Sequence, residues 1–299
     1  MRFIYQFPET SGSAADMLDA GAPADIAVAV EASGWSGVAF TEHPAPGARW
    51  LESGGHQTLD PFVALGHVAA VTHRIRLLTN LAVVPYRNPS LLAKAAASVD
   101  RLSNGRLILG VGTGYLQGEF RALGVDFARR NARFDEALDV LSLHWSGQPF
   151  SYEGHDFVAK ETRALPRPTQ RPIPIWIGGN SALSRRRAAT RAQGWLPLTS
   201  HVDISATVRT PHLDLGDELA ARIAEVRSAA HAERREIDVA VAYTDPSIAQ
   251  PEQDAARHRG EFARLATIGV DWIIVAGPSA VYPASLVWIE QFAANYIDR

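Results

Sequence analysis

The sequence predicts an α/β barrel of eight parallel strands. Short apolar runs rich in β-branched and aromatic residues alternate with helical patterns along the whole chain, as in repeated βαβ units. Eight such strand patterns occur, which is the number that closes an α/β barrel. The chain has 299 residues, and one barrel needs about 250. We therefore expect residues 1–299 to form a single domain.

The strand patterns end where apolar residues give way to glycine, proline or polar side chains. The predicted strands are Arg2–Phe7, Ser36–Thr41, Ile75–Val84, Arg106–Gly112, Ile175–Gly178, Gly194–Pro197, Ile237–Tyr243 and Asp271–Ala276. A helical pattern follows every strand except the sixth, after which the pattern is poor until Leu219. The clearest helices, Leu91 to Leu102 and Phe134 to Trp145, repeat apolar residues at three- and four-residue spacing.

Turn-forming residues support these boundaries. Asn88-Pro89 favours a helix start, and Asn104-Gly105 favours a left-handed helix end before the fourth strand. Phe150–Phe157 is typical of a small hairpin, and the proline-rich segment Pro166–Pro174 can continue neither a helix nor a central strand. We expect both to be insertions on the barrel, and the long connections 198–211 and 244–251 to carry function.

Composition excludes several classes of protein. The chain has 29 basic and 32 acidic side chains and an isoelectric point near 6.4, so small molecules rather than nucleic acids are the expected partners. Without cysteine it has no disulfide, thiolate nucleophile, thiolate-bound zinc or cysteine-held iron–sulfur cluster. No segment has the length of a membrane helix and the N-terminus lacks a signal-peptide core, so we expect a cytoplasmic protein without an anchor.

A glycine-rich run follows the fourth strand. The sequence LGVGTGYLQG, Leu109 to Gly118, lacks the G-x-G-x-x-G spacing of a dinucleotide fingerprint. Gly112 and Gly114 on either side of Thr113 nevertheless leave backbone N–H groups open to a phosphate. A tight turn without a ligand explains this run equally well.

The fifth strand ends in a second loop of this kind. In IWIGGNSALS the strand ends at Gly178-Gly179, and Asn180 and Ser181 can cap a following helix. The exposed N–H groups, the helix dipole and the hydroxyls of Ser181 and Ser184 also favour a bound anion there. Two neighbouring strands thus end in loops that suit a phosphate.

The segment AFTEHP places Glu42 and His43 directly after the second strand, which in a barrel is the catalytic face. A single histidine is more often structural, but one at a strand end is suited to proton transfer, and Glu42 is a candidate to orient its ring. The sequence has no histidine pair with metal-ligand spacing, no H-E-x-x-H and no G-x-S-x-G. It therefore predicts neither a metal site nor a serine-hydrolase elbow.

One long stretch carries a family resemblance. The sequence IRLLTNLAVVPYRNPSLLAKAAASVDRLSNGRLILGVGTG, with EFRALG and PIWIGGNS after it, resembles the bacterial luciferase-like monooxygenase superfamily, specifically its coenzyme F420-dependent class. The resemblance covers about Arg2 to Pro197, and its PYRNP, LSNGR and GVGTG stretches together are specific. It implies a TIM barrel with insertions in the loops at the C-terminal face, a cofactor at that face and a homodimer.

The resemblance also implies roles for individual residues. His43 matches the family's histidine that faces the reactive ring, and Asn80-Leu81 matches a non-proline cis peptide behind the central ring. Expected cofactor contacts are Thr113, Gly114 and Tyr115 after the fourth strand and Gly179, Asn180, Ser181 and Ser184 around the phosphate. Tyr115 stands where some sugar-phosphate dehydrogenases of the class carry a glutamate acid. This departure argues against their mechanism here and makes Tyr115 a further catalytic candidate.

These features predict an oxidoreductase that transfers a hydride between C5 of coenzyme F420, a deazaflavin, and a small organic substrate. One alternative is a monooxygenase that uses FMN, reduced by a separate reductase, to activate oxygen. Another is a flavin-binding protein without turnover. F420 carries a lactyl-oligoglutamate tail that FMN lacks. Arg87, Arg185 and Arg186 are candidates to bind this tail, or are simply solvated surface side chains.

Overall fold

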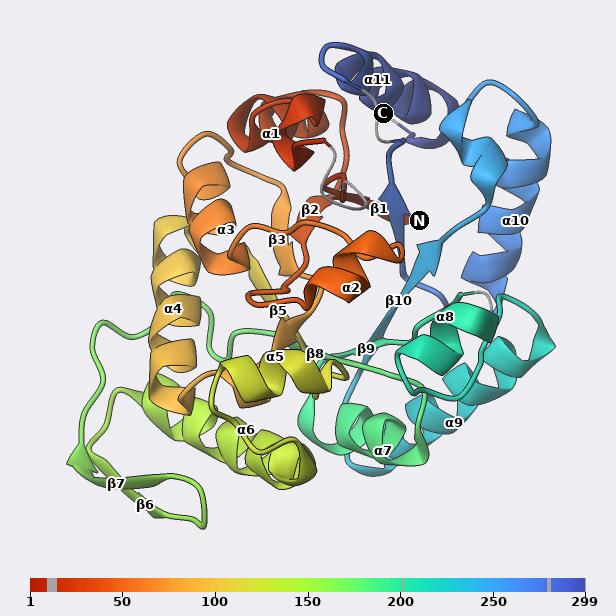
Figure 1. Ribbon diagram of the computed structural model, residues 1–299. Helices are drawn as coiled ribbons and strands as arrows, with labels where there is room; N and C mark the ends of the chain where they lie inside the picture. Colours follow the sequence, from red (N-terminus) through yellow and green to blue (C-terminus); the bar gives the residue numbers. More distant parts are fainter. Residues whose placement is uncertain (10–14, 201, 279–280, 299) are drawn as a thin grey trace.

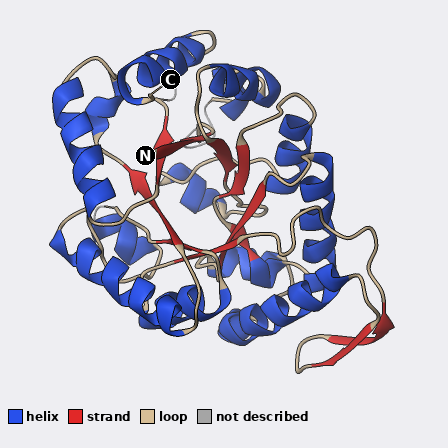
Figure 2. Cartoon of the chain, turned by 180° about the vertical axis from the view of Figure 1, so that it is seen from behind, coloured by secondary structure: helices blue, strands red, loops and turns tan. Residues whose placement is uncertain are grey.

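A closed parallel barrel surrounded by helices forms the molecule in the computed structural model, which describes residues 1–9, 15–200, 202–278 and 281–298 (Figures 1 and 2). The strand order is β3-β2-β1-β11-β10-β9-β8-β5-β4, and a further pairing between β3 and β5 closes the ring. Every neighbouring pair in the ring is parallel. The predicted (β/α)8 TIM barrel is therefore confirmed.

The strands lie close to their predicted places. They are β1 (Arg2–Gln6), β2 (Gly37–Phe40), β3 (Arg76–Thr79), β4 (Ala82–Val83), β5 (Leu107–Gly112), β8 (Ile175–Gly178), β9 (Gly194–Leu196), β10 (Asp238–Tyr243) and β11 (Trp272–Ala276). The first and last of them pair from Arg2 with Trp272 to Gln6 with Ala276, so the two ends of the chain complete the barrel together.

Long helices surround the barrel, and short ones lie over its mouth (Figure 1). They are α1 (Pro23–Ala32), α2 (Ala48–Glu52), α3 (Pro61–Ala69), α4 (Pro89–Leu102), α5 (Gln117–Ala122), α6 (Arg130–Ser146), α7 (Ala182–Arg191), α8 (Val202–Thr207), α9 (Asp217–Ala232), α10 (Ala255–Thr267) and α11 (Ala284–Tyr296), with 3-10 turns η1 (Met17–Ala20), η2 (Val84–Tyr86), η3 (Phe127–Arg129) and η4 (Pro246–Ala249). The predicted ends of α4 are confirmed, since Asn88 accepts a hydrogen bond from the Ser90 N–H and Asn104 has a φ of 55°.

Three predicted boundaries were wrong. The predicted strand Ile75–Val84 is divided, because the ladder to β2 ends at Thr79, β4 pairs with β5, and η2 then begins at Val84. The predicted hairpin Phe150–Phe157 extends further, as β6 (Phe150–Glu153) pairs with β7 (Val158–Thr162). The sixth strand, β9, is followed by the short helix α8, which the sequence pattern does not show.

Alternation along the strands produces two cores. Ile4, Leu78, Ile108, Trp176 and Trp272 belong to the smaller cluster, in which the Trp176 and Trp272 rings meet edge to face at 5.5 Å. The residues on either side of Ile4 and Ile108 belong instead to the larger cluster, which includes the apolar faces of the helices. This is the period-two pattern of strands that are buried on both faces. Among the described residues, no helix combines the length and the apolar character needed to cross a bilayer.

Gly110→Ala should destabilise the barrel, because a Cβ atom at this position would lie 2.1 Å from the backbone oxygen of Thr79. That contact is with a neighbouring strand, which cannot move without disturbing its own ladder. The free energy of unfolding in urea should fall by about 1–3 kcal/mol. Gly118→Ala is the matched control, since a Cβ there meets nothing within 4 Å and α5 should gain stability. Equal stability of the Gly110→Ala protein and the wild type would contradict this expectation, because it would mean that the two strands can separate to accept the methyl group.

Candidate active site

The predicted site segments meet at the carboxyl ends of four adjacent strands. β2 pairs with β3, β3 with β5 and β5 with β8, so the loops after them share one sector of the barrel mouth (Figure 1). His43, Asn80, Thr113 and Ser181 each lie in one of these loops. In a barrel of this type, that face is where loops from several strands can surround a ligand.

His43 is held at both its backbone and its ring. The Thr58 hydroxyl accepts a hydrogen bond from the His43 N–H at 2.9 Å and donates to the His43 carbonyl at 3.3 Å. The imidazole Nδ1 lies 3.2 Å from Glu119 Oε2, and the side chain is 10% exposed. The Trp50 and Tyr115 rings pack against it with centroids at 4.5 and 5.9 Å. The ring therefore has a defined position.

Glu119 decides which nitrogen of His43 carries a proton. Its carboxylate is fully buried and also accepts from the Tyr86 hydroxyl at 2.7 Å and the Ala45 N–H at 3.2 Å. A carboxylate that already accepts from two donors favours a donor at Nδ1 as well. We therefore expect the proton on Nδ1, and Nε2 has no hydrogen-bond partner in the part of the chain that the structure describes.

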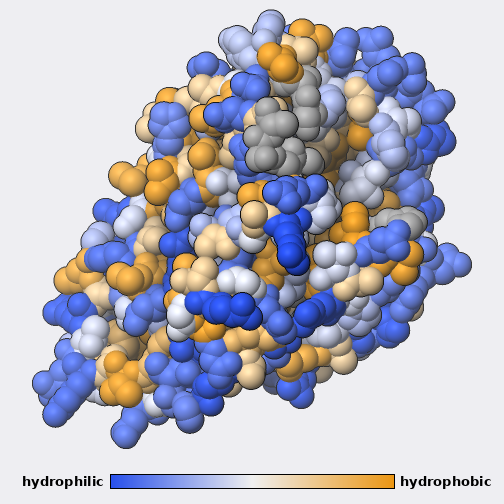
Figure 3. Space-filling view, in the orientation of Figure 1, coloured by the Kyte–Doolittle hydropathy of each residue, from blue (hydrophilic) through white to orange (hydrophobic). Residues whose placement is uncertain are grey.

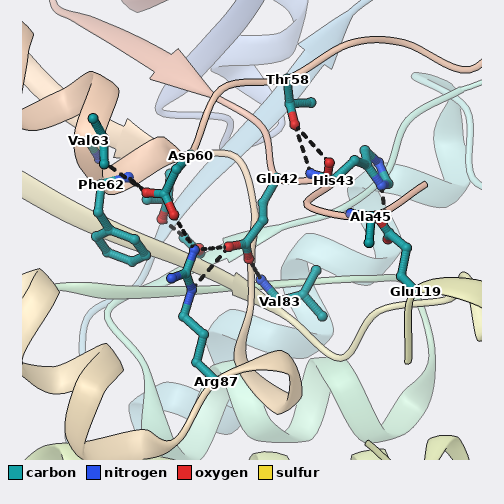
Figure 4. A network of polar contacts seen from close by, with 12 residues as sticks. Glu42, His43, Ala45, Thr58, Asp60, Phe62, Val63, Val83, Arg87 and Glu119 are labelled. Atoms are coloured by element: carbon teal, nitrogen blue, oxygen red, sulfur yellow. Dashed lines mark hydrogen bonds and ion pairs between the residues drawn. The ribbon is translucent and has the colours of Figure 1, made fainter. Parts of the chain in front are cut away.

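The expectation that Glu42 orients His43 was wrong. Figure 4 shows the two side chains directed away from each other, as neighbouring side chains of an extended segment are. Glu42 accepts from the Val83 N–H at 2.6 Å and pairs with Arg87, which also binds Asp60 at 2.7 Å. Glu42 thus ties η2 to the end of β2, and Glu119 takes the place beside the histidine.

Two of the three arginines proposed for an anionic tail are already paired. Arg87 is held by Glu42 and Asp60, and Arg185 by Glu225 at 3.0 Å. Both guanidinium groups therefore already have a carboxylate partner. Arg186 is exposed on α7, and its role stays a prediction.

The peptide bond between Asn80 and Leu81 is cis, as the family resemblance implies. The Asn80 amide donates to Gln6 Oε1 at 2.8 Å, and the Gln6 amide donates to Glu9 Oε1 at 3.1 Å. Leu81 lies over two glycines, because a Cβ atom on Gly112 or on Gly178 would be 2.7 Å from its Cδ1. The two glycines leave room for Leu81 at the centre of the mouth.

The loop after β5 places Tyr115 beside His43. Gly114 has a φ of 75°, and a Cβ atom there would collide with Val83 and with Phe120. Burial, with the negative charges of Glu119 and Glu9, raises the pKa of Tyr115 to about 12. Tyr115 therefore keeps its proton at neutral pH and can act as a hydrogen-bond donor. Thr113 is half-buried in the same loop.

The loop after β8 combines a cap with open backbone donors. Ser181 is the N-cap of α7, where it accepts from the Ser184 N–H at 3.1 Å and meets the Ser184 hydroxyl at 2.9 Å. Gly179 has a φ of 103°, and the Asn180 amide bridges the carbonyls of Leu198 and Pro211. Within the described residues, no acceptor faces the N–H groups of Ala182 and Leu183. These donors at a helix N-terminus fit a phosphate.

A second carboxylate and a second histidine extend the cluster. His56 Nε2 lies 3.1 Å from Glu9 Oε2 without alignment for a hydrogen bond, and the His56 and His43 ring centroids are 5.0 Å apart. Burial raises the pKa of Glu9 to about 7, against the effects of Thr41 and His43. Burial and the charge of His43 lower the pKa of His56 to about 4. Between these two values both side chains are uncharged, so the short distance does not mean an ion pair there.

Comparison with known proteins establishes the family. A family model described as luciferase-like monooxygenase matches residues 1–284. The chain belongs to this family. An uncharacterized protein of Mycobacterium tuberculosis is 37% identical over 142 residues, which cover 48% of this chain and 49% of that protein. An F420-dependent glucose-6-phosphate dehydrogenase of Microbacterium testaceum is 29% identical over 200 residues, covering 66% and 56%. The match therefore spans about half the length of these relatives.

Two solved structures share the barrel fold. The monooxygenase RslO1 from Streptomyces bottropensis has a TM-score of 0.78 at 21% identity, covering 99% of this chain and 98% of that one. The coenzyme F420-dependent tetrahydromethanopterin reductase from Methanopyrus kandleri has a TM-score of 0.68 at 16% identity, covering 99% and 98%. At these identities the likeness shows the fold and does not choose between cofactors.

Another cavity, of about 600 Å³, lies apart from His43, after β9 and β10. Arg257 donates to Asp245 at 2.6 Å, and this contact, with the hydrogen bonds from Ser247, holds the pKa of Asp245 far below its usual range. His258 beneath it is bonded to Tyr243 and Ser247 on its two nitrogens. These residues form hydrogen bonds with one another, whereas Nε2 of His43 has no hydrogen-bond partner among the described residues.

Sequence reasoning missed Glu9, Trp50, His56 and Glu119. Glu9 could have been found, because it follows a strand in the same way as His43. Glu119 begins the EFRALG segment that carries part of the family resemblance, but no pattern in the neighbouring sequence indicates that its side chain is buried. Trp50 lies on the short helix α2 and His56 in the loop after it, and only the tertiary fold determines their neighbours.

Glu9→Gln and His56→Gln should change the slope of the unfolding free energy against pH in opposite directions. The folded-state pKa of Glu9 lies above its ordinary 4.5, so its contribution to stability is present below about pH 4.5 and is lost as pH rises to 7. The folded-state pKa of His56 lies below 6.5, so stability rises with pH between about 4 and 6.5.

Urea unfolding across this range measures both effects. Relative to wild type, Glu9→Gln should gain stability as pH rises, and His56→Gln should lose it. Glu52→Gln, at an exposed position on α2, is the control and should keep the wild-type profile. Parallel profiles for all four proteins would contradict the buried setting of this pair.

Proposed function

We propose that this luciferase-like protein is an F420-dependent oxidoreductase that transfers a hydride between the deazaflavin and a small uncharged alcohol or carbonyl compound. The observation that carries the proposal is His43, which Glu119 holds by Nδ1 while Nε2 is left for a substrate oxygen. The F420-dependent relative from Microbacterium testaceum supports the choice of cofactor.

The residues at the mouth fit such a cofactor. The N–H groups at the start of α7 and the hydroxyls of Ser181 and Ser184 would hold its phosphate. Leu81 and the glycines at positions 112 and 178 would lie against its ring system. When bound, the deazaflavin supplies two-electron hydride chemistry at C5, and the protein supplies position and proton transfer.

His43 has the properties of a general base for alcohol oxidation. A substrate hydroxyl within hydrogen-bond distance of Nε2 would give up its proton there as its C–H hydrogen leaves as hydride. The negative charge of Glu119 stabilises the imidazolium that results, and the Thr58 contacts hold the residue in place. In the reverse direction, Nε2 returns the proton to a carbonyl oxygen. Tyr115, protonated at neutral pH, can donate a second hydrogen bond to the same oxygen.

The charges around His43 argue for an uncharged substrate. The side chains that contact its ring are Trp50, His56, Tyr115 and Glu119, and Glu9 lies behind His56. In this part of the described structure, two carboxyl groups approach the ring and no lysine or arginine does. A phosphorylated substrate would meet no compensating cation here, and desolvation of its charge would be costly.

Reconstitution with F420 tests the proposed cofactor. The purified protein should bind F420 more tightly than FMN, and a panel of alcohols should bleach the absorbance of bound F420 under exclusion of oxygen. A protein that binds reduced FMN instead, and consumes oxygen with the same panel, would be a monooxygenase and would refute the proposal. F420 binding without turnover of any alcohol, aldehyde or ketone would leave only the cofactor assignment standing.

His43→Ala should bind F420 with unchanged affinity and lower turnover by about 10²- to 10⁴-fold, the usual contribution of a positioned acid or base. Stopped-flow reduction of the bound cofactor measures this directly. His67→Ala removes an exposed imidazole from α3 and should react like wild type. A lower melting temperature for His43→Ala with wild-type turnover per folded molecule would mean that His43 only packs.

A further inference from the structure

Two arginines, Arg130 and Arg209, lie near the ring of Phe127 at the edge of the barrel mouth. The guanidinium carbon of Arg130 lies 3.9 Å from the centre of the Phe127 ring, and that of Arg209 lies 5.6 Å from the same centre. Phe127 belongs to η3 and Arg130 begins α6, whereas Arg209 follows α8, so the pair joins two segments that are distant in sequence. Arg209 is exposed and Arg130 is half-buried.

The positive charge of this pair is not neutralised. Among the residues that the structure describes, no carboxylate forms an ion pair with either guanidinium group, although Arg129, Arg133, Arg187 and Arg191 nearby are all paired with aspartates. Burial and the charge of Arg209 lower the pKa of Arg130. Like charges brought together without a counter-ion are unfavourable unless an anion binds between or beside them.

The pair adjoins both loops that fit the cofactor. Thr210, next to Arg209, accepts the Asn180 N–H at 3.0 Å, which places this segment against the start of the phosphate loop. On the other side, the Phe127 ring meets Phe120 at 5.0 Å, and Phe120 packs against Gly114 in the loop after β5. Figure 3 shows strongly hydrophilic side chains near the middle of this face.

We propose that Arg130 and Arg209 form a binding site for the carboxylates of the cofactor's lactyl-oligoglutamate tail. The inference rests on the proposed function, and it assigns the tail to residues other than those the sequence suggested. Arg87 and Arg185 are held by carboxylates, whereas Arg130 and Arg209 have no carboxylate partner among the described residues. Guanidinium groups suit carboxylates because they offer paired donors with a permanent charge. The site would favour F420 over FMN, which has no tail.

Comparing the affinities of two deazaflavins, one with the tail and one without it, measures the contribution of the tail to binding. We would titrate the protein with F420 and with deazaflavin 5′-phosphate, which keeps the ring and phosphate and lacks the tail, and follow quenching of tryptophan fluorescence. Arg130→Gln and Arg209→Gln should each raise the Kd for F420 about tenfold, the loss expected for a charged hydrogen-bonded contact. The Kd for the tail-free compound should stay within about twofold of wild type. Added salt should weaken F420 binding to wild type more than to the double variant.

Control variants distinguish a lost contact with the tail from a misfolded protein. Arg101→Gln removes the same charge from an exposed position on α4, at the opposite end of the barrel, and should change neither affinity. Arg130→Lys and Arg209→Lys keep the charge and should retain part of the F420 affinity.

Each other outcome overturns the proposal in a recognisable way. Unchanged F420 affinity in the glutamine variants would place the tail elsewhere while leaving the F420 assignment intact. Equal weakening of both compounds would show that the arginines hold the phosphate or shape the site. A wild-type protein that binds neither deazaflavin would refute the proposed function and this inference together.

Discussion

The candidate site depends on one buried carboxylate. Glu119 comes from the first turn of α5 and accepts hydrogen bonds from the loop after β2, through His43 and Ala45, and from η2, through Tyr86. A carboxylate at this depth is tolerated only because its oxygens are bonded. The same bonds that compensate its burial join three segments and fix the orientation of His43. Removing Glu119 would leave the loops and the histidine without a common anchor.

The two ends of the barrel use charged residues differently. At the amino ends of the strands, Arg106 donates to the carbonyls of Ala69, Thr72 and Ile75, and Glu31 accepts the N–H groups that precede β3. Both side chains form hydrogen bonds with backbone groups and so contribute to the stability of the fold. At the carboxyl ends, Nε2 of His43 has no hydrogen-bond partner and the arginines at Phe127 have no carboxylate partner among the described residues. This division agrees with the general separation of stability and function between the two faces of a TIM barrel.

Local patterns in the sequence were sufficient for the barrel and for half of the site. The strands and the glycine loops have strong local signals, and the family resemblance predicted the cis Asn80–Leu81 bond that the structure contains. The roles that it implies for His43 and the Ser181 loop stay predictions. The partner of His43 was chosen wrongly because adjacency in sequence suggested Glu42, whereas an extended chain directs neighbouring side chains apart. Glu119 is 76 residues away from His43. Pairings of this kind arise from the tertiary fold, and so does the meeting of Arg130 and Arg209 at Phe127.

The protonation state of His43 tests the central claim most directly, since it needs no substrate or cofactor. Nitrogen-15 NMR of the protein with labelled histidine distinguishes the two neutral tautomers. We expect His43 to carry its proton on Nδ1 in the wild type, and Glu119→Gln, whose amide can also donate, to weaken this preference. A wild-type His43 protonated on Nε2 would contradict it, as would a tautomer that does not respond to Glu119→Gln.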